Sequence, residues 1–243
     1  MKKVIIIGAT SGIGREMARC YVNAGCKVGI TGRRMELLDS FKKEFSDSIS
    51  ERFIVSLCFD VTGSENGVNL DSLISKLGGL DLLIYNSGFG DPSESLDWEI
   101  DKKTVDINVN GFVEIVNRSF RFFVSQGHGH IAATSSVASN RGNSFAPAYS
   151  ASKAFMSCYL EGLYLKARRM KLPVYVTDIQ PGFVRTKEIR VKGQFWIVPV
   201  AKAARQMVYA IEHKRFRVYI SRRWWIIAKL MRIVPRFIYG KFG

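Results

Sequence analysis

Short apolar runs alternate with longer stretches of helical periodicity along the whole chain, and this alternation constrains the fold more than any other feature. Several runs, such as residues 4–8, are almost continuous valine and isoleucine, as expected of strands buried on both faces. Strands that alternate with helices of this length are joined in parallel by right-handed crossovers. The sequence therefore predicts an α/β fold with one doubly wound parallel sheet.

The predicted strands are residues 4–8, 27–33, 53–60, 80–88, 130–136, 174–181 and 217–220. The predicted helices are residues 13–24, 34–45, 70–77, 97–125, 147–170 and 199–213. In such sheets ligands bind at the carboxyl ends of the strands, near the topological switch point.

The cysteines and histidines do not predict a metal site. Cys20, Cys26, Cys58 and Cys158 lack the paired spacing of a zinc site or a disulfide framework, and only three histidines are present. The first apolar run is short and leads into a glycine-rich turn without a cleavage-like site, so we assign it to a strand and not to a signal peptide. Because the four cysteines are expected to be reduced thiols, we expect a cytoplasmic protein without a bound metal.

A glycine-rich turn with Gly8, Gly12 and Gly14 follows the first predicted strand and precedes a helix. Glycine permits a tight turn and close approach of the backbone to a pyrophosphate, whose charge the helix N-terminus then holds. Such turns also simply join strands to helices, but the place of this one after the first strand favours a dinucleotide site.

Arg33 and Arg34 end the second predicted strand, where NAD sites usually carry an acidic residue for the ribose 2′-hydroxyl. Guanidinium groups suit the 2′-phosphate of NADP in both charge and geometry. Arg15, just after the glycine turn, is a third candidate. The alternative is that these are solvated surface arginines. The pattern predicts NADP(H) as the cofactor.

Tyr149 and Lys153 lie four residues apart near the start of a predicted helix, so both side chains face the same space. A phenol with an ordinary pKa near 10 is a poor base at neutral pH. An ammonium about 4 Å away, at an effective dielectric of about 20, favours the phenolate by about 4 kcal/mol. This corresponds to about three pKa units and would bring the pKa of Tyr149 toward neutrality, where proton transfer is most efficient.

These elements, in this order, resemble the short-chain dehydrogenase/reductase family over essentially the whole chain. Tyr-x-x-x-Lys alone is common by chance, whereas six elements in the family's order are not. The elements are the glycine turn, Asp60 after the third strand, Asn86-Ser87-Gly88 after the fourth, Asn108 three residues before Gly111, Ser136 thirteen before Tyr149, and residues 181–186. Ile7, Tyr85 and Ser87 depart from the family's usual residues at the strand ends.

The resemblance implies a single-domain Rossmann fold and four catalytic residues. Ser136 would hold the substrate oxygen, and Tyr149 would transfer the proton. Lys153 would bind the nicotinamide ribose and lower the pKa of Tyr149, and Asn108 would position a proton-relaying water. Ser135 is the alternative catalytic serine, but the spacing favours Ser136. The residues implied to contact NADP(H) are Gly8, Thr10, Ser11, Gly12, Ile13, Gly14, Arg15, Arg33, Arg34, Asp60, Val61, Asn86, Ser87, Gly88, Tyr149, Lys153, Pro181, Gly182, Val184 and Thr186.

Much of the formal net charge of +15 lies near the C-terminus, where residues 222–234 show helical periodicity. Basic residues beside Trp224 and Trp225 are typical of a helix that lies in a membrane surface. Lys229 and Arg232 make this helix too charged to span a bilayer. The alternative is a helix packed on its own domain or in a subunit interface. We expect residues 1–221 to form the Rossmann-fold catalytic domain and 222–243 a basic amphipathic extension of it.

The substrate side of the site is expected to be apolar. Phe145, Phe183, Phe195, Trp196 and Ile197 favour a lipid-like or steroid ketone over a sugar, reduced to a secondary alcohol. A 3-oxoacyl reductase acting on carrier-protein or CoA thioesters and a non-enzymatic NADPH-binding sensor remain alternatives. The resemblance implies a homodimer or homotetramer. Peripheral contact at the inner face of a membrane is a further possibility that the sequence leaves open. The sequence contains no nucleic-acid recognition motif, so we expect no nucleic-acid partner.

Overall fold

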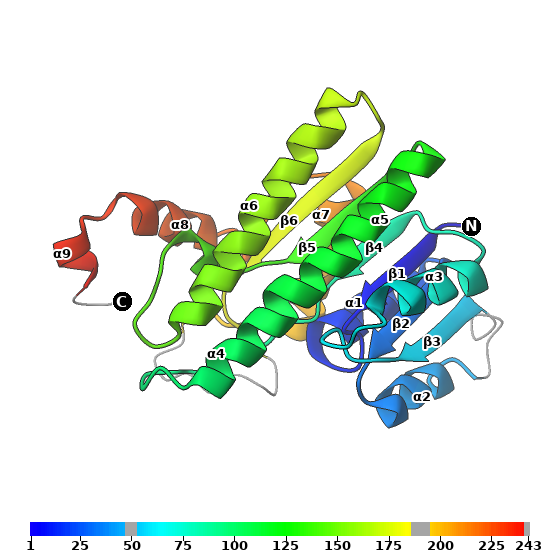
Figure 1. Cartoon of the computed structure of the whole chain (residues 1–243), viewed down its shortest axis with the longest axis horizontal. Helices are drawn as coiled ribbons and strands as arrows, with labels where there is room; N and C mark the ends of the chain where they lie inside the picture. The colour runs from blue at the N-terminus through cyan, green and yellow to red at the C-terminus, as the bar shows by residue number, and fades with distance from the viewer. Residues whose placement is uncertain (47–52, 186–194, 241–243) are drawn as a thin grey trace.

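Seven parallel strands form the sheet of the computed structural model, which describes residues 1–46, 53–185 and 195–240 (Figure 1). Their spatial order is β3-β2-β1-β4-β5-β6-β9, and every neighbouring pair is parallel. The predicted doubly wound parallel sheet is therefore confirmed. The strands are β1 (Lys3–Ile7), β2 (Lys27–Gly32), β3 (Ile54–Cys58), β4 (Leu82–Tyr85), β5 (Gly129–Thr134), β6 (Val174–Pro181) and β9 (Arg217–Ile220).

Helices cover both faces of this sheet. One face carries α1, α2 and α7, and the other carries α3, α5 and α6. Their bounds are α1 (Gly12–Asn23), α2 (Met35–Lys43), α3 (Asn66–Leu77), α5 (Phe112–Gln126), α6 (Pro147–Arg169) and α7 (Val200–Glu212).

Side-chain alternation along the strands supplies a separate hydrophobic core to each face. Val4 and Ile6 of β1 pack with α1, α2 and α7, whereas Ile5 and Ile7 pack with α3, α5 and α6. All four side chains are fully buried, and each such burial stabilises the fold by about 1.5–3 kcal/mol. The continuous apolar run in the sequence follows from this burial on both sides.

The helix predicted over residues 97–125 is interrupted. It consists of α4 (Trp98–Val105), a π-helical turn (Asp106–Gly111) and α5. The Tyr85 hydroxyl donates to the Ile107 carbonyl over 2.7 Å within this turn. A Cβ at Gly111 would lie 2.4 Å from the Val61 carbonyl oxygen, so only glycine allows this approach.

Two further features complete the fold, of which only the helix within residues 222–234 was predicted. β7 (Val184–Arg185) and β8 (Val198–Pro199) form a small parallel sheet of their own. After β9, α8 (Trp224–Ile233) and α9 (Arg236–Tyr239) project from the edge of the molecule (Figure 1, red). In the part of the chain that the structure describes, no helix is both long and apolar enough to cross a membrane. The boundary of the extension at residue 222 stays a prediction.

Candidate active site

The glycine turn lies at the carboxyl end of β1, beside β4, where the strand order reverses. Gly8 and Gly12 have φ of +85° and +57°, which favour glycine, and a Cβ at Gly14 would lie 2.1 Å from the Gly8 carbonyl oxygen. Ser11 precedes α1 without a side-chain cap, and the first turn of α1 contains no acidic residue. The leading N–H groups of α1 can therefore receive a pyrophosphate, and a dinucleotide fits this turn.

Of the three predicted phosphate-binding arginines, Arg34 contacts this turn and Arg33 lies beside Asp60. One guanidinium nitrogen of Arg34 donates to the hydroxyls of Thr10 (3.0 Å) and Ser11 (2.9 Å), and Arg33 lies 3.5 Å from a carboxylate oxygen of Asp60. Arg15 is directed toward α2, where it donates to the Leu37 carbonyl over 2.7 Å and pairs with Glu44.

The segments after β3 and β4 complete the predicted cofactor side. Asp60 accepts from the Thr62 backbone N–H over 3.0 Å, and Val61 is buried. Asn86 accepts from the Thr134 hydroxyl over 3.0 Å and donates to the Gly8 carbonyl over 3.4 Å. Asn86 thus links β5 to the glycine turn.

Ser87 and Gly88 lie where the glycine turn meets the catalytic helix. A Cβ at Gly8 would lie 2.7 Å from the Ser87 hydroxyl, and one at Gly88 would lie 3.2 Å from Lys153 Nζ. The positions that sequence spacing assigned to one site are therefore close in space.

The π-helical turn places Asn108 against the loop after β4. The fully buried Asn108 amide accepts from the Phe89 backbone N–H (2.9 Å) and donates to the Phe89 carbonyl (2.7 Å) and the Ser152 hydroxyl (2.9 Å). Asn108 therefore holds this loop against α6. π-Helical turns are frequent at functional sites.

Ser136, Tyr149 and Lys153 meet between β5 and α6. The Ser136 side chain lies close enough to Tyr149 to lower the pKa of its phenol, and Ser136 Oγ accepts from the Ala138 backbone N–H over 3.1 Å. Lys153 Nζ donates to the Thr134 carbonyl over 2.9 Å and lies 5.8 Å from the centre of the Tyr149 ring.

The pKa of Tyr149 differs from the sequence prediction. Burial raises the pKa of this phenol, and the nearby Ser136 side chain offsets that rise only in part. Burial also lowers the pKa of Lys153 to about 8, against the opposing influence of Asp178. The Lys153 ammonium donates to the Thr134 carbonyl, and it is not among the groups that shift the pKa of Tyr149.

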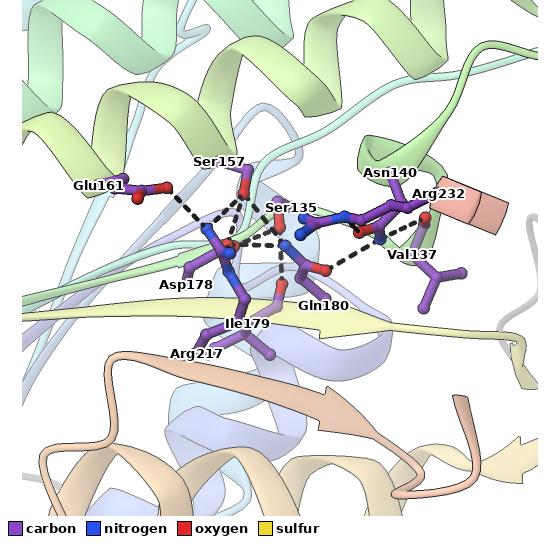
Figure 2. Close-up of polar contacts among 10 residues, drawn as sticks. All are labelled: Ser135, Val137, Asn140, Ser157, Glu161, Asp178, Ile179, Gln180, Arg217 and Arg232. Carbon is purple, nitrogen blue, oxygen red and sulfur yellow. Dashed lines mark hydrogen bonds and ion pairs between the residues drawn. The ribbon is translucent and has the colours of Figure 1, made fainter. Parts of the chain in front are cut away.

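Asp178 on β6 organises a buried polar network behind this site, which the sequence did not predict (Figure 2). Its carboxylate is fully buried and accepts from Ser157 (2.6 Å), Gln180 (2.8 Å) and Arg217 (2.9 Å). The Ser135 hydroxyl donates to it as well. A polar Thr-Asp-Ile-Gln stretch within an apolar strand was the available signal.

Trp224 of α8 packs over the segment after β6. A Cβ at Gly182 would lie 2.1 Å from its ring, and Phe183 and Phe195 lie 5.4 and 5.0 Å away between ring centres. Pro181 and Val184 are buried beside this aromatic cluster. Predicted Thr186 lies outside the described residues.

The sequence model of the short chain dehydrogenase family matches residues 2–194. An uncharacterized oxidoreductase of Myxococcus xanthus is 33% identical over 189 residues, covering 76% of this chain and 73% of its own. An uncharacterized oxidoreductase of Mycobacterium tuberculosis is 28% identical over 239 residues, covering 96% and 92%. A short chain dehydrogenase/reductase from Burkholderia phymatum, solved in complex with NAD, superimposes with a TM-score of 0.84 at 21% identity, covering 94% and 92%.

Proposed function

The chain belongs to the short-chain dehydrogenase family of oxidoreductases, and on that premise we propose that it interconverts a ketone and a secondary alcohol with NADP(H). The observation that carries the proposal is the meeting of Ser136, Tyr149 and Lys153 beside the loop that Asn108 holds. A sensor that only binds the dinucleotide would not need this arrangement.

The preference for NADP(H) rests on Arg33 and Arg34. Arg34 donates to the hydroxyls of Thr10 and Ser11 in the glycine turn, and Arg33 lies beside Asp60. We propose that these guanidinium groups bind the 2′-phosphate, and that Arg15 contributes less because it contacts α2. The remaining cofactor contacts are those predicted, including Thr186.

The catalytic side chains act on a single oxygen atom of the substrate. The bound nicotinamide supplies or accepts the hydride. Ser136 donates a hydrogen bond to the carbonyl oxygen, and Tyr149 protonates that oxygen during reduction. The raised pKa of Tyr149 keeps the phenol in its acid form at neutral pH, which suits ketone reduction. Lys153 holds the ribose and supplies positive charge near the phenol, and Asn108 supports the proton relay.

We propose a hydrophobic, lipid-like or steroid ketone as the substrate. The aromatic side chains Phe195 and Trp196 are 46% and 40% exposed beside the segment after β6, where they can contact an apolar chain. The enzyme would act as a homo-oligomer in the cytoplasm, with its C-terminal segment in peripheral contact with a membrane. A 3-oxoacyl group on an acidic carrier protein is the alternative substrate, since the surface is basic.

An NADPH-oxidation screen tests the proposal with ketosteroids, 3-ketosphinganine, 3-oxoacyl thioesters and small ketones. We expect turnover with the hydrophobic ketones and a loss of about 10²- to 10⁴-fold in Tyr149→Phe, with NADPH binding retained. Near-normal turnover by Tyr149→Phe would reject the mechanism. Reduction of small polar carbonyls alone would reject the substrate class.

A further inference from the structure

An open cavity of about 610 Å³ lies between α7, β9 and the segment that leads into α8. Five cationic side chains line it, and no carboxylate does among the described residues. The cations are Lys202, Arg205, Arg215, Arg222 and Arg223. None of them forms an ion pair within the part of the chain that the structure describes, whereas Arg15, Arg19, Arg118 and Arg217 do.

Such a cluster repels itself and therefore favours an anionic occupant. Arg222 and Arg223 stand at the N-terminus of α8, whose first turn has no acidic residue. Positive charge at a helix N-terminus opposes the helix dipole. These arginines are thus unfavourable for α8 by itself, and an anion at this position would offset both effects.

The helices that follow the cavity expose large apolar side chains. Trp224 and Ala228 of α8 are buried, and the opposite side of the helix is exposed. The exposed apolar residues are Trp225 (48%), Ile226 (51%), Leu230 (45%), Ile233 (74%), Phe237 (75%) and Ile238 (40%). Lys229 and Arg232 lie among them, and from residue 213 onward the sequence contains no acidic residue.

We propose that the basic cavity binds the phosphate headgroups of anionic phospholipids while the exposed side chains of α8 and α9 insert into the same bilayer surface. Basic residues beside aromatic and aliphatic side chains are typical of helices at the membrane interface. α8 has ten residues and is about 15 Å long, half of the hydrocarbon thickness, so it lies along the surface. A second copy of the chain fits less well, because a two-fold contact would place this positive patch against itself.

The same contact would bring the active site close to the lipid. Arg232 donates to Asn140 over 2.8 Å, as Figure 2 shows. Arg141 donates to the Met231 carbonyl over 2.7 Å. α8 is therefore attached to the segment that follows Ser136. Entry of a lipid ketone from the bilayer rests on the proposed function, whereas headgroup binding does not.

Co-sedimentation of the full chain with vesicles tests the site without using turnover. We expect binding to phosphatidylcholine vesicles that contain phosphatidylglycerol and little binding to phosphatidylcholine alone. The variant Arg222→Gln/Arg223→Gln should bind the anionic vesicles about 25-fold more weakly, at about fivefold per charge. The control Lys42→Gln/Lys43→Gln, with the same charge change at the end of α2 near the opposite sheet edge, should change binding little. An equal loss of vesicle binding in both variants would overturn the assignment of the cavity as the headgroup site.

Three further measurements separate a bilayer from other anions. Lipids brominated in their chains should quench tryptophan fluorescence, and Trp225→Phe should reduce the quenching. Binding to the vesicles without quenching would overturn insertion. Binding of soluble poly-glutamate as tight as that of the anionic vesicles would favour an acidic protein partner instead. Inorganic phosphate should compete no better than chloride at equal ionic strength, and stronger competition would overturn the bilayer headgroup as the ligand. Because no arm measures catalysis, failure here leaves the proposed reaction untouched.

Discussion

Two adjacent serines at the end of β5 have different surroundings. Ser135 donates to the buried Asp178, whereas Ser136 lies near Tyr149 and lowers the pKa of its phenol. Successive side chains of an extended segment point to opposite sides, so the two serines cannot share one set of neighbours. The structure thus separates a serine that contacts β6 from one that lies near Tyr149, and the catalytic role of Ser136 stays a prediction.

Arg34 should govern cofactor preference. In Arg34→Ala we expect the ratio of kcat/KM for NADPH to that for NADH to fall by about 10- to 100-fold, because a charged hydrogen-bonding partner of the 2′-phosphate is lost. Arg15→Ala should have a smaller effect, since Arg15 contacts Leu37 and Glu44. Arg121→Ala, an exposed arginine on α5, controls for net charge. An unchanged ratio in Arg34→Ala would reject the NADP assignment.

Lys153 should make stability depend on pH in the alkaline range. Burial lowers its pKa from 10.5 to about 8 in the folded chain. Between these values the unfolded chain binds one more proton, so the free energy of unfolding rises with pH. Relative to Lys153→Met, the wild-type protein should gain up to about 3 kcal/mol across this range in urea unfolding measured at several pH values. A pH-independent difference would contradict the lowered pKa of the buried Lys153.

At the scale of elements, the break between α4 and α5 has a specific cause. Helical periodicity over residues 97–125 predicts one helix, and the π-helical turn at Asp106–Gly111 is set by contacts with other elements. Tyr85 holds the Ile107 carbonyl, and Val61 lies against Gly111. Tyr85, which departs from the family's usual residue, therefore has a structural role that its sequence context does not reveal.

The packing of α8 on the segment after β6 can be tested at Gly182. The added Cβ of Gly182→Ala would lie 2.1 Å from the Trp224 ring, so the indole or the backbone must shift. We expect thermal unfolding to show a free energy of unfolding lower by about 1–3 kcal/mol. The KM for the ketone substrate should rise, because the aromatic cluster moves. Gly142→Ala is the matched control, since its Cβ would meet only Ser150 Oγ at 4.0 Å. Equal stability of the two variants would show that α8 does not pack tightly here.

At the scale of the whole molecule, α6 exposes an apolar stripe along its length. Phe155, Cys158, Gly162 and Leu165 recur at helical spacing and are all exposed. A stripe of this kind on a 23-residue helix is typical of a subunit interface. This surface is separate from the basic cavity at α7 and β9, so an oligomer can form without covering the proposed lipid site.

Charged side chains on this stripe should dissociate the proposed homo-oligomer. We expect Phe155→Glu/Leu165→Glu to elute as a monomer in size-exclusion chromatography with light scattering, because two exposed apolar side chains (41% and 59%) are replaced by charges that an interface would have to desolvate. Val68→Glu on α3, also highly exposed at 69%, should keep the wild-type mass. Retention of the oligomer by the α6 variant would place the interface elsewhere.

The sequence by itself determined the α/β class, the order of the strands along the chain and the spacing of the four catalytic candidates. These properties depend on residues close together in the chain, through side-chain periodicity and the geometry of a single turn. Tertiary structure decided the partner of the Lys153 ammonium, the direction of Arg15, the π-helical turn at Asn108 and the buried Asp178 network. Each of these depends on which distant segments the sheet order places side by side, and the pKa values of Tyr149 and Lys153 follow from the burial that this assembly produces.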